Sequence, residues 1–175
     1  MSSKCPIFAE GEHFRFTRFK MCAIGLSIKD LDDLRSASLL HDIGKVGIPD
    51  GILNKPGPLS EEEWILMKKH SAEGAKIVSH IGELAKLVPV IAHHHEKYDG
   101  SGYPDGLKGE AIPVGARIIS IADAYDTMTT VRRYKKAISH EAALEEILKY
   151  AGTQFDPELA EVLCRAMERK TRVMI

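Results

Sequence analysis

Two adjacent ionisable residues, His41 and Asp42, end an apolar run and constrain this chain more than any other feature of its sequence. Ionisable side chains are costly to bury unless they pair with each other or bind a metal ion. The helical period of residues 26–45 puts His41 on the apolar face, so we expect its imidazole to point into the core. Lys45 lies one turn further on, over the same face if the helix continues that far. The pair is therefore either a buried hydrogen-bonded couple or part of a metal site.

Length and composition suit a single domain that spans residues 1–175. Of these residues 44% are hydrophobic but only 6% are aromatic, which is typical of aliphatic helix packing. The 24 basic and 25 acidic side chains give a net charge of −1, so an anionic ligand must meet a local basic cluster. No apolar run approaches the length of a membrane span. We therefore expect no nucleic-acid polymer as a partner and no span of a bilayer.

The three cysteines, Cys5, Cys22 and Cys164, are far apart and odd in number. They form neither a disulfide framework nor the spacing of zinc ligands. The chain is therefore expected in a reducing cytoplasm.

The sequence predicts an all-α fold, because apolar residues recur with a helical period and no strand-like alternation appears. Capping boxes at Ser27-Asp30 and Ser60-Glu63, and a cap at Ser139, mark helix starts. Glycines and prolines make residues 98–113 a long structured loop, and such loops are often functional. We expect an irregular segment 1–11, helices 12–24, 26–45, 60–70, 71–80, 84–95, 113–128 and 139–152, a loop at 46–59, and a last helix from Pro157. Pro89 either starts or kinks the helix predicted at 84–95.

Histidines and carboxylates recur on successive predicted helices. His41 and Asp42 end one helix, His70 lies near the end of the next, and residues 93–96 (His-His-His-Glu) end another. Asp123 interrupts an apolar helix face. Each has an ordinary reading alone: His70 as a cation at a helix C-terminus, and Asp123 as a buried acceptor. Together they predict a metal cluster inside a helical bundle.

The residue types limit the metal. Imidazole with carboxylate suits iron, manganese, nickel, cobalt or zinc, and argues against calcium. One metal needs about four such groups, so the surplus predicts two metals with a bridging carboxylate such as Asp42. Two metals about 3.5–4 Å apart commonly hydrolyse phosphate esters. Lys45 and the basic run 132–136 would meet the phosphate, although such a run can also be a solvated helix end.

With the motif His41-Asp42-Ile43-Gly44-Lys45 followed by Gly102-Tyr103-Pro104, residues 31–157 resemble the HD-GYP family, a branch of the HD phosphohydrolases. The resemblance implies a compact HD-domain helical bundle with a long glycine-rich loop. It also implies two or three metals, often iron or manganese, and hydrolysis of cyclic di-GMP to linear pGpG and/or GMP in bacterial signalling. Further matching motifs are Ile48-Pro49-Asp50, Lys55-Pro56-Gly57, His94-His95-Glu96, Asp99-Gly100-Ser101, Gly109-Glu110, Ala116-Arg117-Ile118, Ala122-Asp123 and Phe155-Asp156-Pro157.

The same resemblance assigns roles by position. One metal would take His41, Asp42 and Asp123, and the other Asp42, His70, His94 and His95. His93 is then an extra residue with a structural role. Lys45 matches a lysine that assists at the phosphate, and Tyr103, Arg132 and Lys135 match positions that contact the dinucleotide. The loop 99–106 matches a segment linked to diguanylate cyclase (GGDEF) partners, and a homodimer is also open.

Three departures from the family pattern affect these expectations. His13 is the best match to an upstream family histidine, but Arg15 has the wrong offset, so residues 1–25 hold either a shortened first helix or a lost ligand. Ala9 stands where members with three metals have glutamate, which favours two metals here. Val131 and Arg133 replace the usual residues around Arg132 and leave substrate affinity open.

Two other functions therefore stand beside a cyclic di-GMP phosphodiesterase. One is a domain that has lost full metal loading and binds a nucleotide or a signalling partner without catalysis. The other is an HD hydrolase acting on a different nucleotide, which the match through Gly102-Tyr103-Pro104 disfavours.

Overall fold

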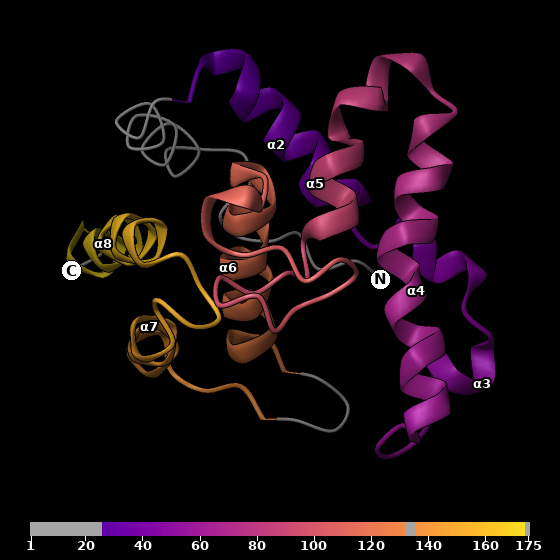
Figure 1. Ribbon diagram of the computed structural model, residues 1–175. Helices are drawn as coiled ribbons and strands as arrows, with labels where there is room; N and C mark the ends of the chain where they lie inside the picture. Colours follow the sequence, from indigo (N-terminus) through magenta and orange to yellow (C-terminus); the bar gives the residue numbers. More distant parts are fainter. Residues whose placement is uncertain (1–25, 132–135, 174–175) are drawn as a thin grey trace.

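Helices joined by loops make up residues 26–131 and 136–173, the part of the chain that the computed structural model describes (Figure 1). No strand occurs in these residues, which confirms the all-α prediction. The elements, with η for 3-10 helices, are α2 (Ile28–Leu40), η2 (Ile43–Gly47), α3 (Asp50–Leu53), α4 (Glu61–Ser79), η3 (Gly82–Leu87), α5 (Val88–His93), η4 (Gly109–Ala111), α6 (Val114–Thr129), α7 (His140–Lys149) and α8 (Pro157–Val173).

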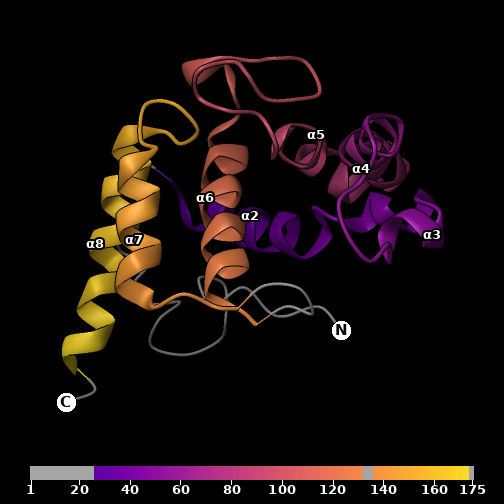
Figure 2. The same ribbon diagram turned by 90° about the horizontal axis from the view of Figure 1, so that it is seen from below.

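Helix α6 runs through the middle of the described chain (Figures 1 and 2). Its residues Ala116, Ile118, Ile119, Ile121 and Ala122 are all buried. These buried residues lie on several sides of the helix, so other elements must surround it, and α2, α5, α7 and α8 all contact α6. Helices α7 and α8 lie side by side on one flank, while α2, α5 and α4 lie on the other (Figure 2). Asp123 sits on this central helix, between the two groups.

The helix that carries the His-Asp pair is shorter than predicted. The capping box of Ser27 and Asp30 is present, but α2 ends at Leu40 and not at Lys45. The chain then tightens into η2, which brings Gly44 against the backbone of α4. Lys45 therefore turns back to Asp42 and does not continue a helix face.

Three other predicted segments differ in detail from the structure. Helix α4 is continuous where the sequence predicts two helices, 60–70 and 71–80; its capping box at Ser60 and Glu63 is confirmed. No proline or cap interrupts this stretch, so the hydrogen bonding simply continues. The predicted helix 84–95 is divided into η3 and α5, with Pro89 in the first turn of α5, where proline is tolerated. The expected loop 46–59 contains the single-turn helix α3.

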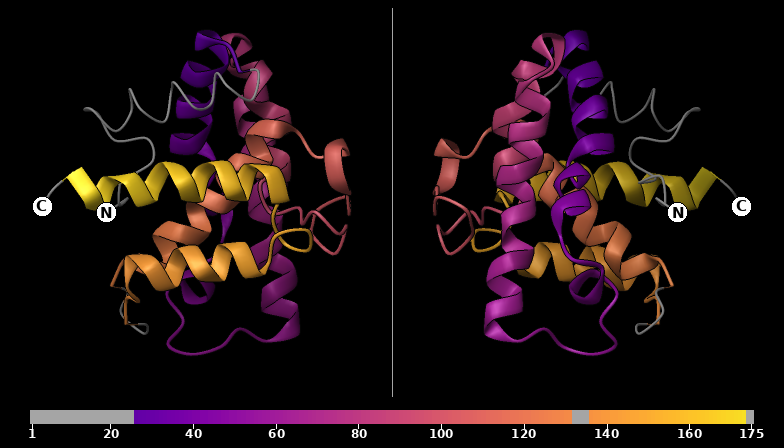
Figure 3. Two further views of the ribbon diagram at one scale, coloured as in Figure 1. Left: turned by 90° about the vertical axis from the view of Figure 1, so that its left-hand side faces the viewer. Right: turned by 90° about the vertical axis from the view of Figure 1, so that its right-hand side faces the viewer.

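The long loop 98–113 is anchored to the turn between α7 and α8, and the two segments meet at one edge of the molecule (Figure 3). The amide of Tyr98 donates to the carbonyl of Gln154 at 3.2 Å, and the amide of Asp99 donates to that of Thr153 at 2.8 Å. On the same side, the Arg117 guanidinium bonds the buried Asp156 carboxylate at 2.5 Å and ties α6 to the start of α8.

The predicted segments 1–11 and 12–24 lie outside the described residues. Within the described ranges, no helix combines the length and apolar character that crossing a bilayer requires.

Replacing Gly44 by alanine is expected to lower the free energy of unfolding by about 1–3 kcal/mol. A Cβ at Gly44 would lie 1.9 Å from the His70 carbonyl oxygen and 2.5 Å from the Gly74 amide nitrogen, so η2 and α4 would have to separate. Urea denaturation measures the change. Gly47→Ala is the matched control, because a Cβ there meets nothing within 4 Å. Equal unfolding free energies for the two variants would contradict this close backbone contact.

Candidate metal centre

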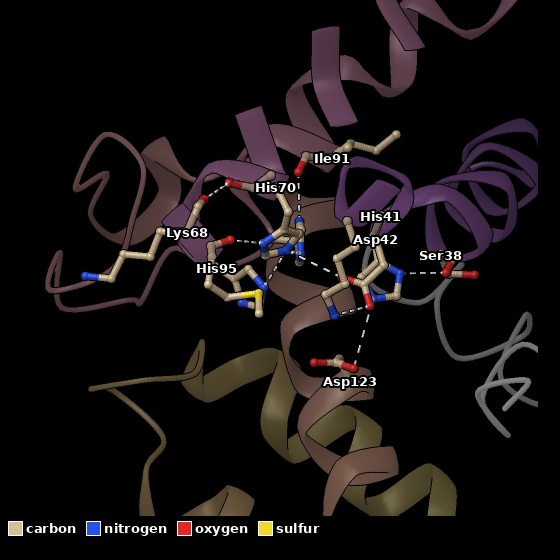
Figure 4. A network of polar contacts seen from close by, with 12 residues as sticks. Ser38, His41, Asp42, Lys68, His70, Ile91, His95 and Asp123 are labelled. Carbon is tan, nitrogen blue, oxygen red and sulfur yellow. Dashed lines mark hydrogen bonds and ion pairs between the residues drawn. The ribbon is translucent and has the colours of Figure 1, made fainter. Parts of the chain in front are cut away.

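Four predicted ligands from three segments meet at one point in the core (Figure 4). Asp42 follows α2, His70 belongs to α4, and His94 and His95 follow α5; one ligand atom of each lies within 4.8 Å of the others. The Nε2 atom of His70 lies 3.1 Å from that of His95, 3.3 Å from that of His94, and 3.4 Å from Oδ1 of Asp42. His70 and His94 are almost fully buried.

The orientation of three imidazoles is set by one repeated hydrogen bond. In each, Nδ1–H donates to the backbone carbonyl three residues earlier: His41 to Ser38 at 2.8 Å, His70 to Met67 at 2.8 Å, and His94 to Ile91 at 2.7 Å. The proton on Nδ1 leaves Nε2 with its lone pair, and that nitrogen is the one facing the cluster.

This orientation tests whether the residues fit a metal ion. The Nε2 atoms of His70 and His94 lie 3.3 Å apart, and both are unprotonated. No hydrogen bond can form between them, and their lone pairs repel each other. A cation shared by both nitrogens removes their repulsion. Imidazole nitrogens with a carboxylate oxygen form a donor set typical of transition metals. The cluster can therefore hold a metal ion.

The two oxygens of Asp42 face different partners. Oδ1 points to His70 at 3.4 Å, whereas Oδ2 lies 3.6 Å from Nε2 of His41 and 2.6 Å from Nζ of Lys45. Asp123 lies beyond His41, with its Oδ1 4.0 Å from the same Nε2 (Figure 4). His41 and Asp123 thus flank the four-residue cluster on the Oδ2 side.

The electrostatics of the site favour the protonation states that metal binding requires. Burial lowers the pKa of His70, and burial together with neighbouring His95 takes the pKa of His94 well below its ordinary value. Burial and the nearby His70 lower the pKa of His95 to about 3. Burial raises the pKa of Asp42, but His41 and Lys45 beside it outweigh burial and leave that pKa below its usual range. Neutral imidazoles and an ionised carboxylate follow.

The Gly102-Tyr103 pair brings the long loop onto the cluster. A Cβ at Gly102 would lie 2.3 Å from the Lys97 amide nitrogen, so only glycine permits this approach. The Tyr103 ring stacks on His95 with centroids 4.9 Å apart, and Nζ of Lys68 lies 5.5 Å from the Tyr103 centroid. Burial, with the nearby charges of Asp42 and Asp123, raises the pKa of the Tyr103 hydroxyl. The phenol is therefore neutral at the cluster rim.

The third consecutive histidine points elsewhere. Nδ1 of His93 bonds the Pro89 carbonyl at 2.7 Å, and its Nε2 lies 2.9 Å from the Asp105 carboxylate. The amide of Asp105 also donates to the buried Glu96 at 2.8 Å. His93 thus belongs to a network that holds the loop to the end of α5.

A cavity of about 320 Å³ opens beside the cluster. His94, His95 and Asp123 belong to its wall, which continues along α6 and over the end of α7. The other lining residues are Ser120, Ala124, Thr127, Met128, Glu146, Tyr150, Gln154 and Phe155.

The structure brings together Asp42, Lys45, His41, His70, His94, His95, Tyr103 and Asp123. His13, Arg132 and Lys135 lie outside the described residues. Sequence reasoning missed the backbone carbonyls that orient the histidines, Lys68 beside Tyr103, and the cavity wall at the end of α7. Backbone acceptors leave no mark on residue identity, and the helical period of α7 signals only its core face.

The HD domain family model matches residues 17–159. The chain belongs to the HD domain family. Its motifs and relatives confirm the predicted resemblance to the HD-GYP branch of this family.

Its curated relatives are longer proteins. The chain is 44% identical over 146 residues to the cyclic di-GMP phosphodiesterase response regulator RpfG of Xanthomonas campestris pv. campestris, covering 81% of this chain and 38% of the relative. It is 43% identical over 143 residues to the 3'3'-cGAMP-specific phosphodiesterase 2 of Vibrio cholerae, covering 79% of this chain and 27% of that protein. The chain therefore spans well under half the length of these two proteins.

Solved structures share the fold. A cyclic GMP-AMP specific phosphodiesterase of V. cholerae (V-cGAP3) aligns with a TM-score of 0.63 and 26% identity, covering 87% of this chain and 41% of that one. Bd1817, an HDG"Y"P protein from Bdellovibrio bacteriovorus, aligns with a TM-score of 0.65 and 24% identity. The alignment covers 85% of this chain and 48% of that one.

Substituting His94 by glutamine is expected to lower the amount of transition metal bound per chain, because the variant loses a buried nitrogen from the cluster. Elemental analysis after anaerobic reconstitution with manganese measures metal per chain. His93→Gln is the matched control, since the adjacent imidazole bonds Asp105 and not the cluster. Equal metal content in the two variants would contradict the cluster as a metal site.

Proposed function

We propose that residues 1–175 form one HD-GYP domain that hydrolyses cyclic di-GMP to linear pGpG and/or GMP in bacterial second-messenger signalling. The observation that carries the proposal is Asp42, whose two oxygens face His70 on one side and His41 on the other. A carboxylate placed in this way suits a bridge between two ions. Relatives named as phosphodiesterases of cyclic dinucleotides support the substrate class.

We infer two metal ions, iron or manganese first, with nickel, cobalt or zinc as alternatives. His41, Asp42 and Asp123 would hold one ion, and Asp42, His70, His94 and His95 the other; His13 is a further candidate outside the described residues. Such ions supply an activated water and neutralise phosphate charge. The protein's own contribution is to fix the ligands through the Nδ1–H bonds and to keep the imidazoles neutral.

The substrate contacts follow from the positions around the cluster. Lys45 is partly exposed and its Nζ lies against Asp42, within reach of a phosphate oxygen that approaches this carboxylate. The neutral hydroxyl of Tyr103 can donate a hydrogen bond without repelling an anion. Arg132 and Lys135 lie outside the described residues and are proposed to contact the dinucleotide, because the arginine side chain matches phosphate geometry.

Two alternatives remain as separate candidates. The relatives of equal similarity that are named for 3'3'-cGAMP make that dinucleotide the second candidate substrate. A domain that binds nucleotide without catalysis is the non-enzymatic candidate. Three further predictions belong to the phosphodiesterase proposal. They are binding of diguanylate cyclase (GGDEF) proteins through loop 99–106, a homodimer and a cytoplasmic location.

Product analysis tests the enzymatic proposal. After anaerobic loading with iron or manganese, the chain is expected to convert cyclic di-GMP to pGpG or GMP, resolved by chromatography. Asp42→Asn should abolish turnover and lower metal content, because both sides of the cluster lose a ligand. Lys45→Ala should keep its metal and lose about tenfold to a hundredfold in turnover, the effect of one charge-assisted hydrogen bond. Turnover by Asp42→Asn at the wild-type rate would rule out the bridging role.

A further inference from the structure

The cavity beside the metal centre has a second wall that the chemistry at the phosphate does not use. Glu146 and Tyr150 come from the last turns of α7, and Gln154 follows in the turn before α8. A small molecule in this cavity would lie between these residues and the imidazoles of His94 and His95.

The three polar residues of this wall are spaced four apart and held by backbone hydrogen bonds. The Tyr150 amide donates to the Glu146 carbonyl at 3.3 Å, and the Gln154 amide donates to the Tyr150 carbonyl at 3.0 Å. The Gln154 carbonyl in turn accepts from Tyr98 at 3.2 Å, at the start of the loop that follows the metal ligands. The wall is therefore fixed relative to His94 and His95 through the backbone.

The Glu146 carboxylate is accessible and has one charged neighbour. Its side chain is 43% exposed, and Oε2 lies 3.3 Å from Nζ of Lys149, which offsets part of its negative charge. Oε1 and the second lone pair of Oε2 remain to accept hydrogen bonds. A carboxylate repels phosphate but accepts hydrogen bonds. The part of the bound molecule that faces Glu146 should therefore be uncharged and carry hydrogen-bond donors.

Guanine has that pattern. Its Watson–Crick edge presents two adjacent donors, N1–H and N2–H, which match the two oxygens of one carboxylate. Adenine presents a donor beside an acceptor on the same edge, so a carboxylate satisfies only half of it and faces the lone pair of N1. A tyrosine ring can stack on either base.

We propose that this cavity is a guanine subsite, in which Glu146 accepts hydrogen bonds from N1–H and N2–H of the base and Tyr150 stacks on its face. The side-chain amide of Gln154 supplies a donor for O6. The volume of about 320 Å³ accommodates one nucleoside. The inference rests on the proposed function, because it places one nucleoside of the substrate next to the reacting phosphate.

Binding of mononucleotides tests the subsite apart from hydrolysis. GMP and AMP each carry one phosphate and one base, and neither contains a phosphodiester to be cleaved. Calorimetry on the manganese-loaded full chain is expected to give tighter binding of GMP than of AMP. Glu146→Gln should weaken GMP about tenfold to a hundredfold, the discrimination of one bidentate contact, and leave AMP unchanged or tighter.

The neighbouring Glu145 provides the matched control, because Glu145→Gln makes the same chemical change on an exposed part of α7 outside the cavity. It should bind both nucleotides as wild type does. Tyr150→Leu should weaken GMP and AMP alike and keep their ratio, which separates stacking from edge recognition.

Three results would overturn the subsite. They are equal affinity of wild type for GMP and AMP, wild-type GMP affinity in Glu146→Gln, or hydrolysis of cyclic di-GMP by a chain that binds neither mononucleotide. Failure of the proposed function gives a different pattern. In that case no cyclic dinucleotide is hydrolysed, yet GMP is preferred over AMP and the preference is lost in Glu146→Gln.

Discussion

The donation of Nδ1–H to a backbone carbonyl three residues earlier is the contact on which the site depends. It fixes the ring orientation and the tautomer of His41, His70 and His94, so that each Nε2 faces inward with a lone pair. In two of the three cases the acceptor lies in the last turn of a helix, where carbonyls lack partners within the helix. His41 is the C-cap of α2 and His94 that of α5. At these two positions one hydrogen bond therefore both satisfies a carbonyl at the end of the helix and orients the imidazole.

Close backbone contacts then bring the ligand-bearing segments together. Gly44 lies against α4 next to His70, and Gly102 lies against the segment that follows His95. A side chain at either position would separate two of the segments that supply ligands. The glycines in the two sequence motifs thus have a packing role, whereas Asp42 and Tyr103 of the same motifs lie in the cluster and against His95.

The sequence was sufficient to predict what depends on residue type and local period. The all-α class, the capping boxes at Ser27 and Ser60, and the set of histidines and carboxylates follow from such signals. It was insufficient where tertiary packing decides. Helix 26–45 was predicted too long because the apolar period continues through Leu40, whereas the chain turns there to bring Gly44 against α4. The cavity wall was missed because Glu146 and Gln154 become neighbours of His95 only through the contacts of the loop 98–113 with the α7–α8 turn.

A cyclic dinucleotide combines anionic phosphates with uncharged bases, and these parts need different surroundings. Helix α6 contributes to both proposed regions, because Asp123 faces His41 at the cluster and also lines the cavity, together with Ser120 and Thr127 from the same helix. The buried Arg117–Asp156 pair fixes α6 against the start of α8, and hence against the turn that carries Gln154. Because Ile118, Ile119 and Ile121 of α6 are buried in the core, the helix cannot shift toward either region without disturbing the packing. The distance between the metal-ligand cluster and the proposed base-binding wall is therefore set by the packing of the central helix.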